Sequence, residues 1–181
     1  NTLKFTIKDN ATYNPSNLIH NYSWNSATAT SSQYELRIRA TDTAGLFTIA
    51  TSRNITIDNE APTLPALSTP ANYSNFTTIP PLVWTASTHW LNKSIHYMVQ
   101  VDDDAGFGSP AYTNYALAVP TATPTGLTDG NYYWRVASST GIINGSWTNA
   151  RYFSIDSTAP LLYLDAPTNK TYYQLINDLN Y

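Results

Sequence analysis

The feature that most constrains the fold of this 181-residue chain is an internal repeat at a fixed spacing. The segment YELRIRAT at 34–41 returns 98 positions later as YYWRVASS at 132–139. Two further landmarks keep the same spacing and the same order. The matches are 34–41 with 132–139, ITID at 55–58 with FSID at 153–156, and the Ala-Pro pairs at 61–62 and 159–160. An ordered set of matches at one spacing predicts tandem copies of one folding unit.

The repeated segments have the pattern of β-strands. Tyr34, Leu36 and Ile38 alternate with charged residues, which is the two-residue period of a strand with one buried face. Segments 95–101 and 132–136 show a similar alternation. Clusters of Gly, Pro, Asn and Asp separate these segments at short intervals, and no window has a convincing helical period. The pattern therefore predicts an all-β chain of short strands arranged as a β-sandwich.

Two groups of segments carry a family resemblance. TDTAG at 41–45, followed by IDNEAP at 57–62, resembles the end of the immunoglobulin-like repeats in bacterial and archaeal surface proteins. YMVQVD at 97–102, LTDGNYYWRV at 127–136 and the stretch 146–156 are similar to the fibronectin type III-like repeats of such proteins. The resemblance covers nearly the whole chain and implies tandem immunoglobulin-like (fibronectin type III-like) β-sandwiches. It also implies an extracellular location at the cell surface, whereas this fold implies no particular activity.

The Ala-Pro pairs mark the expected boundaries, because Pro62 and Pro160 fix φ and hold the preceding residue in an extended conformation. The middle unit, 61–158, is expected to be a complete fibronectin type III-like sandwich. The first unit, 1–60, opens on what corresponds best to a second strand. We therefore expect it to be an immunoglobulin-like sandwich that lacks its first strand. The final piece, 159–181, is expected to supply the first strand of a following or neighbouring sandwich.

This division of the chain suggests a mode of assembly. An unpaired strand exposes backbone donors and acceptors, and a sandwich without an edge strand exposes core, so pairing relieves both defects. The hypothesis is strand exchange, in which 1–181 is one window on a longer array or filament. The alternative is an arbitrary end, with 159–181 as a loose tail. The residues expected to exchange are Leu161, Leu162, Tyr163 and Leu164.

The composition limits the function classes. Only 12% of the residues are charged and the net charge is −3, so nine Lys and Arg are too few for a nucleic-acid surface. No run of about 20 apolar residues could span a membrane. Cysteine is absent, which removes disulfides, thiol catalysis and thiolate metal sites. Asn, Ser and Thr together fill 60 of the 181 positions, which predicts a polar surface with few charges.

Eight Asn-x-Ser/Thr sequons predict a glycosylated surface in a secreted protein. Asn54 lies on an expected strand but alternates with Ile55 and Ile57, so its side chain is expected to point outward. The alternative is a polar surface whose sequons are unmodified. The eight sequon residues are Asn10, Asn21, Asn54, Asn72, Asn75, Asn92, Asn144 and Asn169.

Acidic residues supply two weak candidates for a metal site, of which one is the pair Asp58 and Glu60 at an expected unit boundary. Asp102, Asp103 and Asp104 form a run between two expected strands, and calcium takes six to eight oxygen ligands. The spacing fits no EF-hand loop. Asp residues in turns ordinarily accept hydrogen bonds from their own backbone, and that is the favoured interpretation. No metal and no cofactor are therefore predicted.

The sequence contains no recognisable catalytic motif. His20, His89 and His96 fit neither a nucleophile elbow nor a metal-ligand spacing, and there is no phosphate-binding Gly loop. We therefore expect that the protein is not an enzyme. Trp84 and Trp134 occupy inward strand positions and are interpreted as core.

These patterns together predict a structural extracellular protein that forms a cell-surface rod, sheath or filament. Its expected partners are further copies of itself and, secondarily, surface glycans. The alternative function is a carbohydrate-binding or adhesin module of a larger secreted protein, which would need two or three exposed and coplanar aromatic rings. The candidate rings are those of Trp90, Trp147, Tyr133 and Tyr115.

Overall fold

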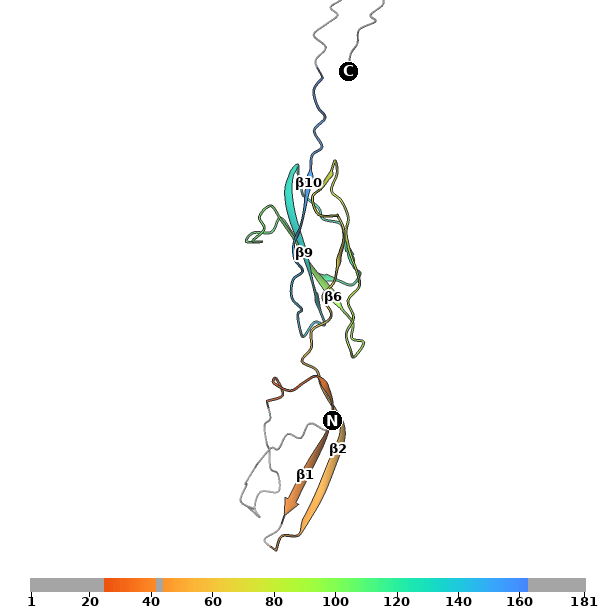
Figure 1. Cartoon of the computed structure of the whole chain (residues 1–181), viewed down its shortest axis with the longest axis vertical. Coiled ribbons are helices and arrows are strands. Elements are labelled where there is room, and N and C mark those ends of the chain that lie inside the picture. Colours follow the sequence, from red (N-terminus) through yellow and green to blue (C-terminus); the bar gives the residue numbers. More distant parts are fainter. Residues whose placement is uncertain (1–24, 42–43, 163–181) are drawn as a thin grey trace, which may run out of the picture.

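The computed structural model describes residues 25–41 and 44–162, and within these ranges every regular element is a β-strand. A two-stranded hairpin and a two-sheet sandwich lie end to end along the long axis of the molecule (Figure 1). The predicted all-β class is thus confirmed, and the sandwich architecture agrees with the prediction. The strand on which the first unit is expected to open lies outside the described residues.

The hairpin consists of β1 (Ser32–Thr41) and β2 (Phe47–Ile57), which pair antiparallel. The alternation predicted for β1 is present in the strand but is expressed only weakly as burial, because Leu36 is half-buried and Ile38 is 61% exposed. On β2, Asn54 has a φ of 63° beside an irregularity in the pairing. The hairpin therefore keeps an apolar face that the described residues leave largely open.

The sandwich is built from two sheets. The smaller one has the strand order β3-β5-β8 and the larger one the order β4-β10-β9-β6-β7. The strands of the smaller sheet are β3 (Leu67–Thr69), β5 (Leu82–Trp84) and β8 (Thr121–Ala122). Those of the larger sheet are β4 (Ser74–Phe76), β6 (His96–Asp102), β7 (Tyr112–Leu117), β9 (Gly130–Ser139) and β10 (Arg151–Ile155). Strand β4 pairs parallel with β10, and every other pairing is antiparallel.

The two sheets enclose one hydrophobic core. Trp134 and Phe153 are fully buried, and Trp84 is 2% exposed. Trp84 reaches across from the smaller sheet to Tyr97 of the larger one, with ring centroids 5.4 Å apart in an edge-to-face arrangement. Aromatic rings favour this geometry and remove a large apolar area from water, so these residues hold the sheets together. Trp84 and Trp134 are core residues, as their inward strand positions predict.

Over three residue pairs the hairpins β1–β2 and β9–β10 have the same register at the 98-residue spacing, and beyond them the registers differ by one residue, because Leu36 pairs with Ser52 whereas Trp134 pairs with Arg151. Ser32 pairs with Ile57 as Gly130 pairs with Ile155. Two further pairs match in the same way. They are Gln33 with Thr56 against Asn131 with Ser154, and Tyr34 with Ile55 against Tyr132 with Phe153. The sequence repeat therefore has a counterpart in backbone pairing.

Side-chain hydrogen bonds also recur at this spacing. The Tyr34 hydroxyl donates to the Thr30 carbonyl over 2.6 Å, and the Tyr132 hydroxyl donates to the Thr128 carbonyl over 3.0 Å. A tyrosine at the start of a strand that bonds back to the preceding turn is a hallmark of Greek-key sandwiches. A second bond closes the end of each hairpin. The Asn59 backbone N–H donates to Ser31 Oγ over 2.7 Å, as the Ser157 N–H donates to Asp129 Oδ1 over 3.1 Å.

Candidate functional site

A cluster of polar side chains joins the end of β2 to the sandwich. Asp58 follows β2 directly, and three side chains from the loop after β5 lie around its carboxylate. Trp90 Nε1 donates to Asp58 Oδ1 over 2.9 Å, and the Lys93 ammonium pairs with Oδ2 at 2.5 Å. His89 Nε2 lies 3.3 Å from Oδ1. We call Asp58, His89, Trp90 and Lys93 the junction cluster.

The protonation pattern of His89 follows from its hydrogen bonds. Its Nδ1 accepts from the Leu91 backbone N–H over 3.3 Å, so the ring proton sits on Nε2. That nitrogen then donates to the Glu60 carbonyl, which is 3.2 Å away, and it also lies close to Asp58 Oδ1. The imidazole is buried, and it orients the chain that links the hairpin to the sandwich.

The junction cluster also lowers the pKa of Asp58. The hydrogen bond from Lys93, and then that from Trp90, hold the pKa of Asp58 below its ordinary value, although partial burial opposes the shift. The carboxylate is therefore charged at neutral pH and stays paired with the ammonium. Sequence reasoning missed this cluster, because Asp58 and Lys93 are far apart in sequence. The acidic pair Asp58 and Glu60 at the boundary was the available signal.

The outer face of the larger sheet carries a stacked arginine. Arg135 donates from Nε and a terminal nitrogen to Gln100 Oε1 over 2.8 and 2.7 Å. Its guanidinium carbon lies 4.0 Å from the centre of the Phe107 ring and 4.7 Å from that of the Trp147 ring. Gln100 in turn donates to the Tyr115 hydroxyl over 2.8 Å. Trp147 is thus engaged with a cation of its own chain.

Three tyrosines form a second group on this face. The ring centroid of Tyr152 lies 5.5 Å from that of Tyr73 and 5.4 Å from that of Tyr133. The ring planes are inclined by 42° and 65°, so these rings do not form a flat platform. We call Tyr73, Tyr152 and Tyr133 the tyrosine strip. The other exposed candidates, Trp90 and Tyr115, lie outside it and are 40% and 52% exposed.

Five of the eight sequon residues lie in the described part of the chain, and the side chains of all five are exposed. Asn54 points outward from β2, as the alternation predicts. Asn54 and Asn92 both have positive φ angles, of 63° and 51°. The five described residues are Asn54, Asn72, Asn75, Asn92 and Asn144; Asn10, Asn21 and Asn169 lie outside the described residues.

The acidic run after β6 divides into three environments. Asp102 is only 2% exposed and accepts a hydrogen bond from the Ser109 N–H over 3.3 Å. Asp104 accepts from the Gly106 N–H over 2.6 Å, and Asp103 is exposed. Two of the three carboxylates thus bond the backbone of their own loop, as Asp residues in turns ordinarily do. Within residues 25–41 and 44–162, no three His, Asp or Glu side chains are grouped so that they could hold a metal ion.

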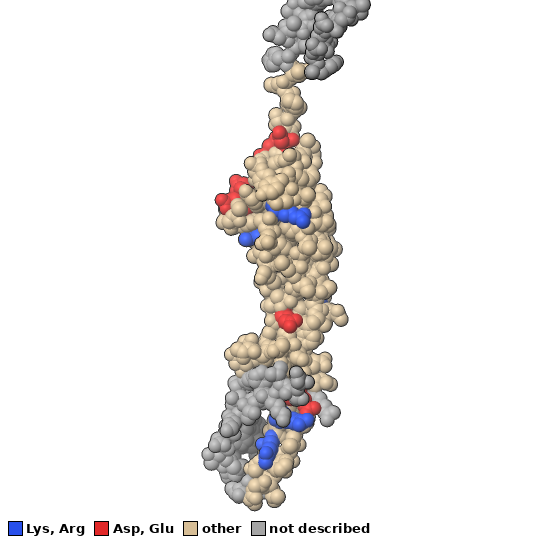
Figure 2. Space-filling model, in the orientation of Figure 1, with Lys and Arg blue, Asp and Glu red and all other residues tan. Residues whose placement is uncertain are grey.

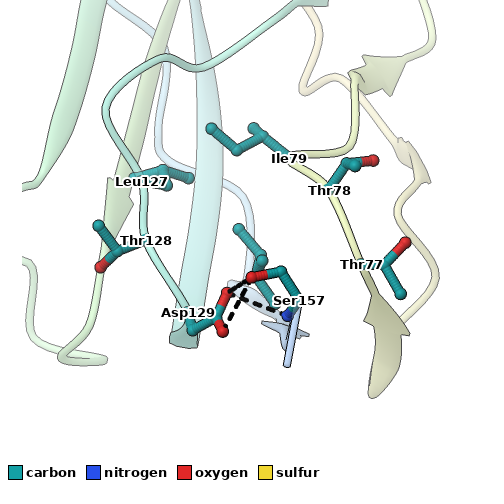
Figure 3. Close-up of a pocket in the computed structure, with 8 residues that line it drawn as sticks. Thr77, Thr78, Ile79, Leu127, Thr128, Asp129 and Ser157 are labelled. Atoms are coloured by element: carbon teal, nitrogen blue, oxygen red, sulfur yellow. Dashed lines mark hydrogen bonds between the residues drawn. The ribbon is translucent and has the colours of Figure 1, made fainter. Parts of the chain in front are cut away.

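A shallow hollow of about 460 Å³ lies at the far end of the sandwich (Figure 3). Asp129 lies at its rim and accepts hydrogen bonds from Ser157 Oγ at 2.8 Å and Thr158 Oγ1 at 3.1 Å. These hydrogen bonds hold the pKa of Asp129 below its ordinary value, and those from Ser157 have the largest effect. The carboxylate is engaged in closing the end of the sandwich. The lining residues are Thr77, Thr78, Ile79, Leu127, Thr128, Asp129, Ile155 and Ser157.

The residues predicted to exchange strands lie beyond this end. Leu161 and Leu162 are 91% and 94% exposed and belong to no strand, and Tyr163 and Leu164 lie outside the described residues. Charged side chains are sparse on the face of the molecule shown in Figure 2, in line with the low charged content of the sequence. A search of the described residues for a helix long and apolar enough to cross a membrane finds none.

Neither a family model nor any curated protein matches this sequence. The function is therefore inferred from the residues and contacts of this chain itself.

Proposed function

We propose that this chain is a structural extracellular protein of tandem immunoglobulin-like, fibronectin type III-like β-sandwiches that forms a cell-surface rod, sheath or filament. The observation that carries this proposal is the match between the hairpins β1–β2 and β9–β10 in register, in tyrosine bonding and in end closure. Three independent features that recur at one spacing support two copies of one unit. The five-stranded and three-stranded sheets around buried tryptophans support the immunoglobulin-like assignment.

The junction cluster supports a stiff connection between units. A short linker with Pro62 has few accessible conformations, and Asp58 adds an ion pair and a hydrogen bond across the connection. A rod needs such fixed joints, because free hinges between units would let it coil. The low charged content is consistent with a surface covered by sugars, for which the five exposed described sequons provide sites.

Self-association is the second part of the proposal. The hairpin has an exposed apolar face, on which Ile38 is 61% exposed, and Leu161 and Leu162 are exposed apolar residues at the other end of the described chain. The two surfaces could therefore pack against each other in different copies. Burying such side chains against one another is favourable by roughly 25 cal/mol per Å² of apolar surface. Strand sharing between copies would bury both surfaces and would pair the backbone of the exchanged segment.

The alternative, a carbohydrate-binding or adhesin module, has less support. The tyrosine strip is not flat, and Trp147 stacks on Arg135. Enzymatic activity is not proposed, because the carboxylates of Asp58 and Asp129 are occupied by hydrogen bonds that close structure. The proposed role is mechanical.

The proposal is tested by the shape and the assembly of the purified chain. Small-angle scattering and electron microscopy are expected to find rods, and sedimentation velocity is expected to find association that increases with concentration. The double variant Leu161→Lys, Leu162→Lys is expected to abolish association and leave the fold intact, as judged by circular dichroism. The matched control is Ile142→Lys, which places a charge on another exposed residue, 83% exposed. Compact monomers that bind glycans would instead support the alternative.

A further inference from the structure

Two sequons lie together at one edge of the larger sheet. Strand β4 is the edge strand next to β10; Asn72 precedes it and Asn75 lies within it. Edge strands have unpaired backbone groups that invite pairing with other chains, and natural proteins cover or block them. A pair of modified Asn residues at this edge would provide such a cover.

The carboxamides of both residues are oriented by β10. Asn72 Oδ1 accepts from the Tyr152 N–H over 2.8 Å, and Asn75 Oδ1 accepts from Ser154 Oγ over 2.5 Å. With each oxygen held against β10, the amide nitrogen of each carboxamide is directed away from that strand. This nitrogen is the atom that carries the sugar in an Asn-linked glycan. The orientation therefore presents it for modification at no cost to the hydrogen bonds that fix the turn.

Tyr73 has a strained backbone conformation. Its φ of 63° lies in the left-handed region, which is unfavourable for a bulky side chain, and 75% of the residue is exposed. The Tyr73 N–H donates to the Tyr152 carbonyl over 2.8 Å, so its backbone is tied to the same residue that holds Asn72. The strained turn thus places an exposed aromatic residue directly after the Asn of a sequon, at the same edge of the sheet.

We propose that Asn72 carries an Asn-linked glycan whose first sugar packs against the exposed ring of Tyr73 at the β4 edge. This inference rests on the proposed glycosylation of the chain and specifies where one glycan is fixed. The C–H groups of a pyranose ring pack on an aromatic face, and a single sugar needs only a single exposed ring. The inclination between the rings, which disfavours a flat polysaccharide platform, is therefore no obstacle.

The modification uses a lipid-linked oligosaccharide as the sugar donor. The amide nitrogen of Asn72 forms a bond to the anomeric carbon and loses one proton, while the bond from that carbon to the lipid phosphate oxygen breaks. The lipid phosphate leaves with the bonding electrons, so no oxidant or reductant is required. Ser74 completes the sequon, and its hydroxyl donates to the Ala71 carbonyl over 2.7 Å within the same turn.

The test compares the whole chain made in a host with Asn-linked glycosylation and in one without. Glycopeptide mass spectrometry is expected to find Asn72 occupied. Ser74→Ala removes this sequon but keeps Asn72. Ser74→Ala is expected to lower the thermal midpoint more in the glycosylating host than in the other host. The difference between the two losses is expected to be about 2–4 °C. Tyr73→Ala is expected to remove that difference, and the matched control Tyr115→Ala is expected to retain it.

A second measurement does not depend on the stability of the variants. Sugar protons at Asn72 are expected to show ring-current shifts in NMR spectra, relative to those at Asn92. Occupied sequons elsewhere with an empty Asn72, or an occupied Asn72 without ring-current shifts, would overturn this inference and leave the proposed function standing. A chain without a glycan at any sequon would overturn the glycosylation part of both.

Discussion

The hydroxyl of Tyr132 is the most direct point at which to test the closure of the sandwich. It donates to the Thr128 carbonyl over 3.0 Å and accepts from the Thr128 N–H over 3.2 Å, while its ring lies 5.7 Å from that of Phe153 in the core. Tyr132→Phe keeps the ring and removes only the two hydrogen bonds. At roughly 1 kcal/mol for each bond, the loss is about 2 kcal/mol. For a unit of about 100 residues this lowers the thermal midpoint by roughly 10 °C.

The assay is equilibrium unfolding in urea, followed by tryptophan fluorescence, because the buried Trp84 and Trp134 both report on this sandwich. The matched control is Tyr133→Phe, whose hydroxyl is on the outer face and has no hydrogen bond to the described residues. We expect this control to change the free energy of unfolding by less than about 0.5 kcal/mol. Equal effects of the two substitutions, or a loss below about 0.5 kcal/mol for Tyr132→Phe, would show that the Tyr132 hydroxyl does not close the sandwich.

The pKa of Asp58 is lowered in the folded chain, so its stabilising contribution is present above the ordinary Asp pKa of about 3.9 and is lost as pH falls through the folded value. The Trp90 indole N–H resonance is expected to shift in NMR spectra as Asp58 titrates. Asp58→Asn is expected to remove this shift, and the control Asp156→Asn, at the equivalent position of the other hairpin, is expected to retain it. The same shift in the unsubstituted chain and in both variants would contradict the contact between Trp90 and Asp58. Asp129→Ala removes the acceptor for the Ser157 N–H and is expected to lower the calorimetric midpoint, whereas Asp129→Ser retains an acceptor, as in the other hairpin. Trp134→Ala empties a fully buried site and is expected to cost about 3–5 kcal/mol in urea unfolding; a cost below about 1 kcal/mol would contradict the described core.

The long strands could be predicted from the sequence because their alternation is regular. Residues 34–41 and 95–101 read as strands and match β1 and β6 within a few positions. The short strands could not be predicted in this way. Strand β3 has three residues and β8 has two, which is too short for any period to show, and tertiary pairing decides them.

The contacts of the candidate site were harder to predict from the sequence than the strands. The outward position of Asn54 followed from local alternation alone, whereas the junction cluster forms only when the loop around Trp90 and Lys93 folds back on Asp58. Patterns in a single sequence describe residues a few positions apart, and they contain no information on tertiary contacts between distant segments. The stacking of Arg135 between two rings is a similar case, because its partners come from separate loops.

We propose that this chain forms part of a structure on the outside of the cell. Immunogold labelling of intact cells, with an antibody against the sandwich at 61–158, tests it most directly in the electron microscope. We expect gold particles along filaments or over the surface layer of unpermeabilised cells, at regular spacing where rods are resolved. Labelling confined to the interior of permeabilised cells would contradict it.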